Sequence, residues 1–258
     1  MTPRFYCSTA LELGAIVTLD EASNHHALKV LRLQDGAAVE LFNGDGHAYR
    51  ATLLVLGKRA QVRIEHVAPR DPPSLFERIL VQGISTSEKM AWTIEKAVEL
   101  GVDKIIPLQS HRSKVKLDAQ RAATKATRWQ DLIHSACAQC GRNTVPELLA
   151  AIDLESLLAS GTIHSAATKL MLQPGSSESL LTSLPQHATD NRQIVLFCGP
   201  ESGFDESEIA LLRQSGAQGI HLGWRILRTE TAGIAALAII DAAYAQENTK
   251  TNTEHTQR

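Results

Sequence analysis

From residue 79 onward, short apolar runs of the sequence alternate with segments of helical periodicity. In the first helical segment the apolar residues recur at i, i+4, i+7 and i+8 from Met90, and Gly101 stands where a C-cap glycine is expected. Strands that alternate with helices form a mostly parallel sheet covered on both faces, so the pattern predicts an α/β domain. The predicted strands are residues 79–81, 104–108, 169–172, 194–198 and 219–222, and the predicted helices are residues 87–100, 118–140, 206–214 and 231–245.

The first seventy residues show a different pattern, in which short strand-like runs predominate. Residues 38–42, 48–56 and 61–67 are such runs, and the first two are separated by the turn Asn43-Gly44-Asp45-Gly46. The polar segment 70–74 contains two prolines, which lack an amide donor and cannot continue a strand or helix. We therefore predict a small β-barrel in residues 1–72, an α/β domain in residues 75–245, and a disordered polar tail in residues 246–258.

Length and composition limit the class of protein. A chain of 258 residues with 43% hydrophobic content can fill two cores. It has no apolar run near the ~20 residues that span a bilayer and no apolar segment near its start. Its four cysteines, Cys7, Cys137, Cys140 and Cys198, are scattered along the chain, which fits free thiols in a reducing compartment. We expect a cytoplasmic protein that is neither exported nor inserted in a membrane.

The charge is unevenly distributed. A net charge of -2 argues against a protein that coats nucleic acid through bulk charge. Between residues 112 and 142, however, the sequence has only two acidic residues and seven basic ones, which are Arg112, Lys114, Lys116, Arg121, Lys125, Arg128 and Arg142. Such a cluster either holds a phosphate backbone or forms an ordinary solvated helix face.

A glycine-containing loop follows the predicted strand 194–198. It reads Gly199-Pro200-Glu201-Ser202-Gly203-Phe204, and it precedes an Asp205 to Glu208 pair with the spacing of a helix capping box. Loops at the carboxyl ends of parallel strands bind small ligands, because glycine permits close backbone approach and the helix start presents free N–H groups. Taken alone, the loop fits an ordinary glycine turn equally well.

The segment 222–232 repeats this arrangement of strand, glycine loop and helix. Its sequence is Leu-Gly-Trp-Arg-Ile-Leu-Arg-Thr-Glu-Thr-Ala, and two such loops at neighbouring strand ends would share one crevice. Arg225, Arg228 and Glu230 stand between apolar segments, where charged side chains generally have a partner or a ligand. Either they bind a ligand, or Arg228 forms an ion pair with Glu230 or Glu201 that ties the loops together.

Several familiar sites are absent from the sequence. It contains no Gly-x-Gly-x-x-Gly fingerprint after a strand, no P-loop and no Gly-x-Ser-x-Gly elbow. Cys137 and Cys140 have no second cysteine pair at a zinc spacing, so we predict no metal site. His25 and His26, followed by Lys29 and Arg32, fit either RNA contact or a plain surface helix.

These elements together resemble the 16S ribosomal RNA (uracil-N3)-methyltransferase family of the SPOUT superfamily. The resemblance covers nearly the whole chain apart from the tail. The matching segments are Asn24-His25-His26, residues 29–32, Glu88-Lys89-Met90, residues 96–102, residues 138–142, Gly199-Pro200-Glu201 and residues 226–232. Two positions depart from the family pattern: Ser202 stands where glycine is usual, and Trp224 where proline is usual.

The resemblance implies a PUA-like RNA-binding barrel followed by a SPOUT domain, in which a deep trefoil knot holds S-adenosylmethionine. It also implies a homodimer that methylates N3 of a uridine in the 16S rRNA of the small ribosomal subunit. The implied cofactor-binding residues are Leu172, Gly199, Pro200, Glu201, Leu222, Gly223, Ile226, Leu227, Arg228 and Thr231.

Methylation of uracil N3 requires loss of a proton and stabilisation of the resulting anion. Arg228 is the candidate for the anion, and Glu230 and Glu201 are candidate proton acceptors. The candidate RNA-binding residues are His25, His26, Lys29, Arg32, Arg112, Lys114, Lys116 and Arg142. Two alternatives stay open: a non-catalytic RNA-binding or ribosome-assembly factor, and a SPOUT enzyme that acts on transfer RNA or on a ribose hydroxyl.

Overall fold

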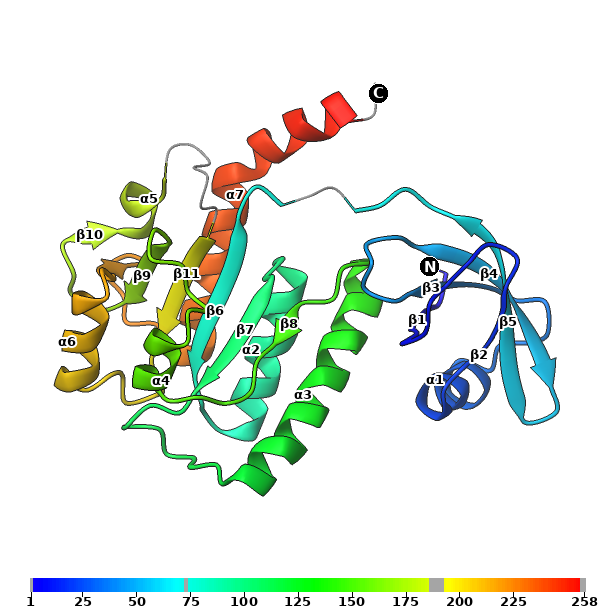
Figure 1. The fold of residues 1–258 in the computed structure, drawn as a ribbon, viewed down its shortest axis with the longest axis horizontal. Coiled ribbons are helices and arrows are strands. Elements are labelled where there is room, and N and C mark those ends of the chain that lie inside the picture. Colours follow the sequence, from blue (N-terminus) through cyan, green and yellow to red (C-terminus); the bar gives the residue numbers. More distant parts are fainter. Residues whose placement is uncertain (1, 72–73, 186–192, 256–258) are drawn as a thin grey trace. The chain divides into compact units, whose positions relative to one another are not determined.

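The structure is a computed structural model that describes residues 2–71, 74–185 and 193–255 (Figure 1). The chain divides into two compact units. Unit 1 comprises residues 1–72 together with residues 134–145, and unit 2 comprises residues 73–133 and 146–258. The segment 134–145 thus groups with the N-terminal residues, although it lies beyond the proline segment at which the sequence suggests a division. Among the described residues, no helix is long and apolar enough to cross a membrane.

Unit 1 is built on a five-stranded sheet. The strands are β1 (Arg4–Tyr6), β2 (Ile16–Thr18), β3 (Ala38–Phe42), β4 (Tyr49–Leu56) and β5 (Arg59–Val67), in the order β1-β3-β4-β5-β2. β1 runs parallel to β3, and the other pairs are antiparallel. The three central strands were predicted from the sequence. β1 and β2 were not, because three residues are too few to show a period of two.

One short helical stretch covers this sheet. Asp20 caps α1 (Glu21–His25), since its carboxylate accepts from the backbone N–H of Ser23 at 2.7 Å. The chain continues as a π-helix (His26–Val30), in which Ala27 is fully buried. Ala27 joins a core made by alternate residues of the strands, including Val39, Leu41, Leu53, Val62 and Ile64.

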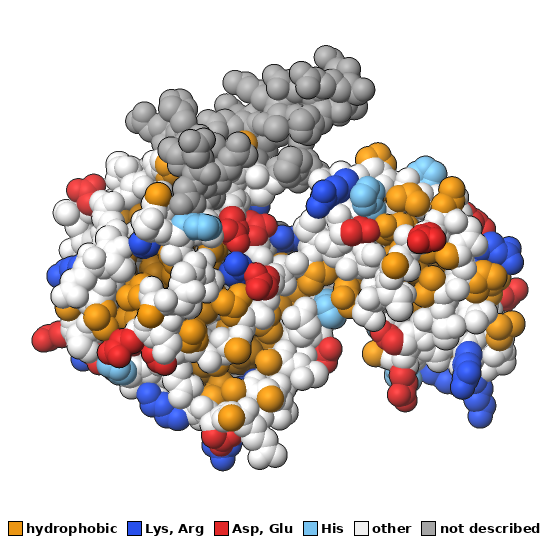
Figure 2. Space-filling model, in the orientation of Figure 1, with side chains coloured by type: hydrophobic (Ala, Val, Ile, Leu, Met, Phe, Trp, Pro, Cys, Tyr) orange, Lys and Arg blue, Asp and Glu red, His pale blue; other side chains and the backbone are white. Residues whose placement is uncertain are grey.

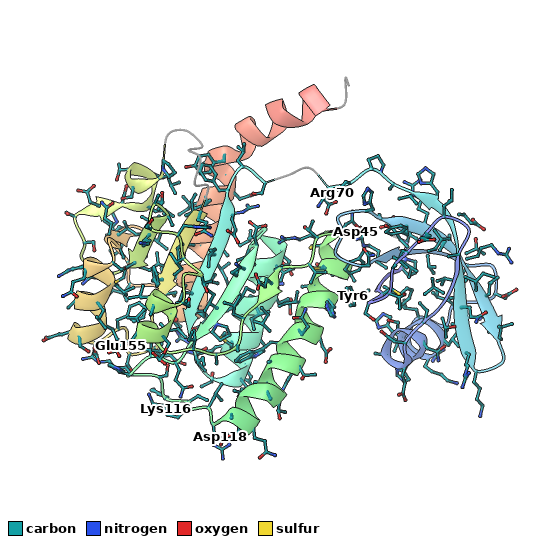
Figure 3. All side chains as sticks on the ribbon, viewed as in Figure 1. Tyr6, Asp45, Arg70, Lys116, Asp118 and Glu155 are labelled. Carbon is teal, nitrogen blue, oxygen red and sulfur yellow. The ribbon has the colours of Figure 1, made fainter. Side chains whose placement is uncertain are left out.

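The segment 134–145 is held in unit 1 by polar and ring contacts. The ring of Tyr6, labelled in Figure 3, stacks on that of His134 with 3.6 Å between centroids. Arg4 donates to the Asn143 side chain at 2.6 Å, and Asp71 accepts from both nitrogens of Asn143 at 2.8 and 2.6 Å. These contacts join residues far apart in the sequence, so no local sequence pattern predicts them.

Unit 2 contains a seven-stranded sheet in which every pair is parallel. The strands are β6 (Glu77–Gly83), β7 (Lys104–Leu108), β8 (Glu147–Leu148), β9 (Thr168–Leu172), β10 (Glu178–Ser179), β11 (Gln193–Cys198) and β12 (Gln218–His221). Their order is β10-β12-β9-β11-β6-β7-β8. This confirms the predicted α/β fold with a mostly parallel sheet, while the knot stays a prediction.

Helices cover both faces of this sheet. They are α2 (Ser87–Glu99), α3 (Ala119–Cys140), α4 (Leu154–Ala159), α5 (Leu180–Ser183), α6 (Glu206–Gln214) and α7 (Thr229–His255). Ile79 and Val81 of β6 belong to a core with residues of α4 and α6. Leu80, which points to the opposite face, meets Gly233 of α7, where a Cβ atom would lie 3.1 Å from its Cδ1.

Except for the end of α7, the predicted elements of unit 2 are found within two residues of their expected bounds. β8, β10, α4 and α5 were not predicted, because segments of two to six residues carry no readable period. α7 extends to His255, so the helix enters the tail that was expected to be disordered. Once a buried helix has formed, each further residue adds a hydrogen bond without a new nucleation cost. Residues 256–258 lie outside the described residues.

Candidate functional site

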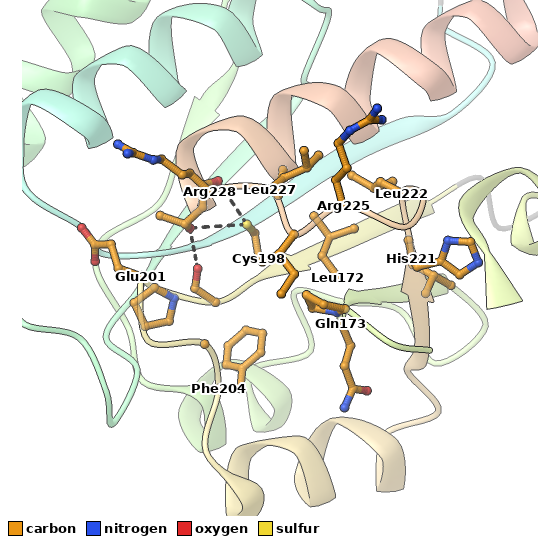
Figure 4. Close-up of a pocket in the computed structure, with 18 of the residues that line it drawn as sticks. Leu172, Gln173, Cys198, Glu201, Phe204, His221, Leu222, Arg225, Leu227 and Arg228 are labelled. Carbon is orange, nitrogen blue, oxygen red and sulfur yellow. Dashed lines mark hydrogen bonds between the residues drawn. The ribbon is translucent and has the colours of Figure 1, made fainter. Parts of the chain in front are cut away.

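A cavity of about 320 Å³ lies at the carboxyl ends of β9, β11 and β12 (Figure 4). β9 stands between the other two strands in the sheet, so the two glycine-containing loops flank it. The cavity is lined by Lys89, Leu172, Gln173, Pro174, Cys198, Gly199, Pro200, Glu201, Gly203, Phe204, Ile220, His221, Leu222, Gly223, Arg225, Ile226, Leu227, Arg228, Thr229 and Ala232. The two loops therefore share one crevice, as the sequence predicts, and the volume lies within the roughly 300–1,000 Å³ of small-molecule sites.

The loop after β11 packs closely against the end of β6. A Cβ atom on Gly83 would lie 2.4 Å from the backbone nitrogen of Pro200, and one on Gly199 would lie 3.0 Å from that of Phe204. Gly203 adopts a left-handed φ of 69°, whereas Ser202 is not among the described non-glycine residues with positive φ. Serine at position 202 therefore carries no strain of the kind that glycine would relieve.

A buried hydroxyl connects three elements behind the cavity. Thr229, only 8% exposed, accepts a hydrogen bond from Gln82 at 2.9 Å and donates one to the carbonyl of Gly199 at 2.5 Å. The thiol of Cys198 also lies 3.5 Å from the Thr229 carbonyl (dashed lines in Figure 4). Because Gln82 belongs to β6 and Thr229 begins α7, this network fixes the loop after β11 to both elements. Burial raises the pKa of the Cys198 thiol, which therefore stays protonated.

Two carboxylates approach one lysine beside the cavity. The Lys89 ammonium lies 3.7 Å from Glu201 Oε1 and 3.3 Å from Glu230 Oε2. Burial acts to raise the pKa of Glu230, but its own backbone N–H, the Lys89 ammonium and the charge of Arg228 outweigh burial. The pKa therefore lies below its ordinary value, and Glu230 is ionised near neutral pH.

Arg228 does not form the ion pair that the sequence suggested as one alternative. Among the described residues no ion pair or side-chain hydrogen bond of Arg228 is found, and its side chain is exposed. Figure 4 shows its guanidinium pointing away from Cys198. The tie between Glu201 and Glu230 is Lys89 instead, because α2 brings this residue to the cavity from a distant part of the chain.

Comparisons with known proteins assign the chain to a family. Residues 72–241 match the model of an RNA methyltransferase domain, and residues 19–65 match that of an RNA methyltransferase PUA domain. The chain belongs to the RNA methyltransferase family. The ribosomal RNA small subunit methyltransferase E of Buchnera aphidicola (strain Sg) is 31% identical over 94% of this chain and 96% of its own length.

Solved structures with the same fold cover almost the whole RNA methyltransferase. Ribosomal RNA small subunit methyltransferase E from Neisseria gonorrhoeae, bound to S-adenosylmethionine, is 39% identical with a TM-score of 0.84. A protein from Legionella pneumophila, in complex with the same cofactor, is 36% identical with a TM-score of 0.87. Each comparison covers 94% of this chain and 98% of the other.

Most cofactor-site residues predicted for this RNA methyltransferase surround the cavity. Leu172, Gly199, Pro200, Glu201, Leu222, Gly223, Ile226, Leu227 and Arg228 line it. Thr231 and Glu230, in the first turn of α7, are not among the lining residues. Sequence reasoning missed further lining residues, namely Lys89, Gln173, Pro174, Cys198, Gly203, Phe204, Ile220, His221 and Ala232. Cys198 and His221 are the last residues of β11 and β12, and Gln173 follows β9, so position at a strand end in a parallel sheet is the signal that would have identified these three.

Trp224 and Arg225 lie at the outer edge of this site. Trp224 is 83% exposed, and the guanidinium carbon of Arg225 lies 4.2 Å from the centre of its ring. A Cβ atom on the adjacent Gly223 would meet open space, although its φ of 118° favours glycine. The Trp224 departure thus changes the surface beside the cavity and leaves the packing of its loops intact.

The basic residues of the RNA methyltransferase fall into two groups. His25, His26, Lys29 and Arg32 are exposed around the π-helix of unit 1, and Arg32 has a left-handed φ of 53°. Arg142 also belongs to unit 1, where its Nε donates to Thr144 at 3.0 Å. On the face shown in Figure 2, basic, acidic and apolar side chains are interspersed rather than gathered in one large field.

In unit 2, two of the candidate RNA-binding residues contact the protein itself. Arg112 donates to the carbonyls of Ser202 and Phe204 at 3.3 and 3.4 Å, and so supports the loop after β11. Lys116, seen near α3 in Figure 3, donates to the carbonyls of Ser110 and His111. Lys114 is exposed. Part of this charge therefore stabilises the loops around the site.

The loop that carries these residues is anchored to the start of α6. Glu208, 1% exposed, accepts from the Ser110 hydroxyl at 2.9 Å and from the backbone of His111 at 3.1 Å. Asp205 and Glu208 form the predicted capping box, and Asp205 also lies 2.7 Å from the His111 ring. Although His111, Asp205 and Glu208 lie together in the manner of metal ligands, their polar atoms already contact protein groups.

This anchor makes stability depend on pH. The hydrogen bond to Asp205 raises the pKa of His111, while Ser207, the Glu208 backbone and His111 lower that of Asp205. The stability that His111 contributes through its raised pKa is fully present below the pKa of an unfolded histidine, about 6.5. It is lost as pH rises through the pKa of His111 in the folded protein. The stability that Asp205 contributes through its lowered pKa is present above about pH 4, the pKa of an unfolded aspartate, and is lost as pH falls through the pKa of Asp205 in the folded protein.

We therefore expect the melting temperature of the wild type to fall more steeply than that of His111→Gln between about pH 6 and pH 8. The other histidines are common to both proteins, so the difference between the two curves isolates His111. Because the ring is exposed, the difference should be small. Parallel curves across this range would contradict a stabilising role for the ion pair.

Proposed function

We propose that this chain transfers a methyl group from S-adenosylmethionine to N3 of a specific uridine in 16S ribosomal RNA of the small ribosomal subunit. The observation that carries the proposal is one cavity formed by two glycine-containing loops, lined by Lys89, Glu201 and Arg228, with Glu230 held next to it by Lys89. The ribosomal RNA methyltransferase from Neisseria gonorrhoeae binds the same cofactor in a closely similar fold.

The residues of the cavity fit S-adenosylmethionine. Leu172, Leu222, Ile226 and Leu227 offer apolar surface for a flat adenine ring. Gly199, Gly203 and Gly223 also line the cavity without side chains, which permits close approach of a ligand to the backbone. When bound, the cofactor supplies a methyl group on a positively charged sulfur.

The polar side of the cavity fits the chemistry of uracil N3. The N3 proton must be removed, and Glu201 and Glu230 are the carboxylates placed to accept it. Negative charge then spreads over the flanking carbonyl oxygens of the base, where the exposed guanidinium of Arg228 is free to donate hydrogen bonds. N3 lies on the Watson–Crick edge, so the uridine must be unpaired or flipped out of a helix to reach these residues.

Unit 1 supplies the expected grip on RNA. Its exposed His25, His26, Lys29 and Arg32 lie along one helical stretch, where cations and imidazoles can contact phosphates. The free state of Cys7, Cys137, Cys140 and Cys198 fits the reducing cytoplasm in which ribosomes are assembled. Burial raises the pKa of the Cys137 thiol to about 12, which argues against a redox role for the Cys137 to Cys140 pair.

Two measurements test the function. Calorimetry should show binding of S-adenosylmethionine with micromolar-order affinity. N3 methylation blocks base pairing, so reverse transcription of 16S RNA should stop at one uridine in the parent strain and read through it in a deletion strain. Binding without any lost stop would favour action on another RNA, and absence of cofactor binding would favour the non-catalytic RNA-binding factor.

We further propose a homodimer, which light scattering can test. Ile234, Ala235, Ala238 and Ile239 of α7 are only half-buried, and Trp92 of the neighbouring α2 is 53% exposed. Apolar surface of this kind on helices that pack together is stabilised when a partner covers it. We expect a particle of about twice the chain mass of 28.1 kDa at micromolar concentration, and a monomer there would contradict the proposal.

A further inference from the structure

Lys89 contacts two glutamates that come from two other elements of the fold. It lies in the first turn of α2, Glu201 lies in the loop after β11, and Glu230 lies in the first turn of α7. The three side chains are 29%, 17% and 15% exposed. One partly buried cation thus joins two partly buried anions that come from different segments of the chain.

The two carboxylates are not satisfied by the protein alone. Glu201 Oε2 is buried and has no hydrogen-bond partner among the described residues, and Glu230 Oε2, also buried, meets only the Lys89 ammonium at 3.3 Å. Buried carboxylate oxygens are costly to leave without a donor, so such atoms beside a cavity point to a donor brought by a ligand. Without Lys89, the two neighbouring carboxylates would repel one another.

We propose that Lys89 is a positioning residue of the methyl-transfer site. It holds Glu201 and Glu230 side by side, so that the unpaired oxygen of Glu201, with Glu230 next to it, accepts the imino N–H of an unpaired pyrimidine base. The proposal rests on the proposed function and deepens it, because it names the groups that orient the base and the residue that sets their geometry.

The proton and electron balance of the step is simple. The N3–H bond of the base breaks, and its proton passes to a carboxylate oxygen of Glu201 or Glu230. The N3 electron pair forms the new bond to the methyl carbon as the carbon–sulfur bond breaks and its electrons leave with sulfur. The carboxylic acid then returns its proton to water.

The matched comparison lies on the same helix. Lys96 also contacts two glutamates, Glu95 and Glu99, each at 2.7 Å, but these are its neighbours on α2 and do not line the cavity. Lys96→Met therefore measures how the loss of a lysine with two acidic partners affects the stability of α2. Any further effect of Lys89→Met on methylation then comes from the position of Lys89 at the cavity.

We expect Lys89→Met to lower the single-turnover rate of methylation by about tenfold or more. It should also move the acidic limb of the pH–rate profile to higher pH, because Lys89 helps to lower the pKa of Glu230 and its loss lets that carboxylate take up a proton at higher pH. The titratable groups that face these carboxylates are Lys89 from α2, Arg228 from the preceding loop and Cys198 from β11. Lys89→Arg should restore most of the rate, and Lys96→Met should match the wild type.

The triple variant Lys89→Met, Glu201→Gln, Glu230→Gln distinguishes a positioning role of Lys89 in methyl transfer from a purely structural role. It removes the repulsion between carboxylates, so we expect its melting temperature to recover while its methylation rate stays low. Recovery of the rate with the melting temperature, or a pH profile of Lys89→Met equal to that of the wild type, would overturn the proposal. Wild type and Lys96→Met report on the function itself in the same assay, and their inactivity would overturn the proposed function and this inference together.

Discussion

Replacement of Gly83 by alanine should abolish binding of S-adenosylmethionine. The added Cβ atom would lie 2.4 Å from Pro200 N and 2.7 Å from the carbonyl carbon of Gly199. These are backbone atoms, so the clash cannot be relieved by rotation of a side chain. The loop after β11 must move, and with it the Gly199 carbonyl that accepts from Thr229.

The matched control is Gly161→Ala in the loop after α4. Gly161 has a left-handed φ of 73°, and a Cβ atom there would meet no atom within 4 Å. The control should lose roughly 1 kcal/mol of stability from backbone conformation alone, with cofactor affinity unchanged. Calorimetry and thermal melting of both variants provide the comparison. Wild-type affinity in Gly83→Ala would show that the loop after β11 is not part of the cofactor site.

Arg228→Ala should reduce methyl transfer by about 100-fold or more while cofactor affinity stays nearly unchanged. Removal of one preorganised donor from an anion site has an effect of this size. The structure also predicts an unchanged melting temperature, because the Arg228 side chain is exposed and has no ion pair among the described residues. Its backbone carbonyl, which accepts from Thr231 and Ala232 at 2.9 Å, is retained in the variant.

The control is Arg213→Ala, an exposed arginine in the last turn of α6. Single-turnover methylation, calorimetry and thermal melting should show no change for this variant. If Arg228 were a structural tie between the loops, its replacement would instead lower the melting temperature and cofactor affinity together. Unchanged methylation by Arg228→Ala would refute its role in stabilising the base anion.

The sequence predicted those parts of the site that are encoded locally. The glycines at positions 199 and 203, the capping box at Asp205 and the alternation of strands and helices can all be read within short windows. They were enough to predict the parallel sheet and one shared crevice. The depth of a knot and the order of strands, in contrast, depend on contacts between distant segments.

The charged side of the site could not be predicted in the same way. The sequence shows Arg228 close to Glu230, and this proximity suggested an ion pair. In the folded chain, α2 brings Lys89 to both carboxylates, and the loop turns Arg228 outward. Arg112 likewise reads as a residue for binding phosphate, but its guanidinium contacts two carbonyls of the loop after β11.

Unit 1 is made of two separate stretches of sequence, and this affects when it can fold during synthesis. Chains emerge from the ribosome N-terminal end first, and the residues of the sheet are complete before the segment 134–145 has been made. Until then Arg4 and Asp71 lack Asn143 as their partner, and Tyr6 lacks His134. Unit 1 is therefore complete only after residues 73–133 of unit 2 have been made, and a fragment that ends at residue 72 would lack the segment that pairs with Arg4, Tyr6 and Asp71.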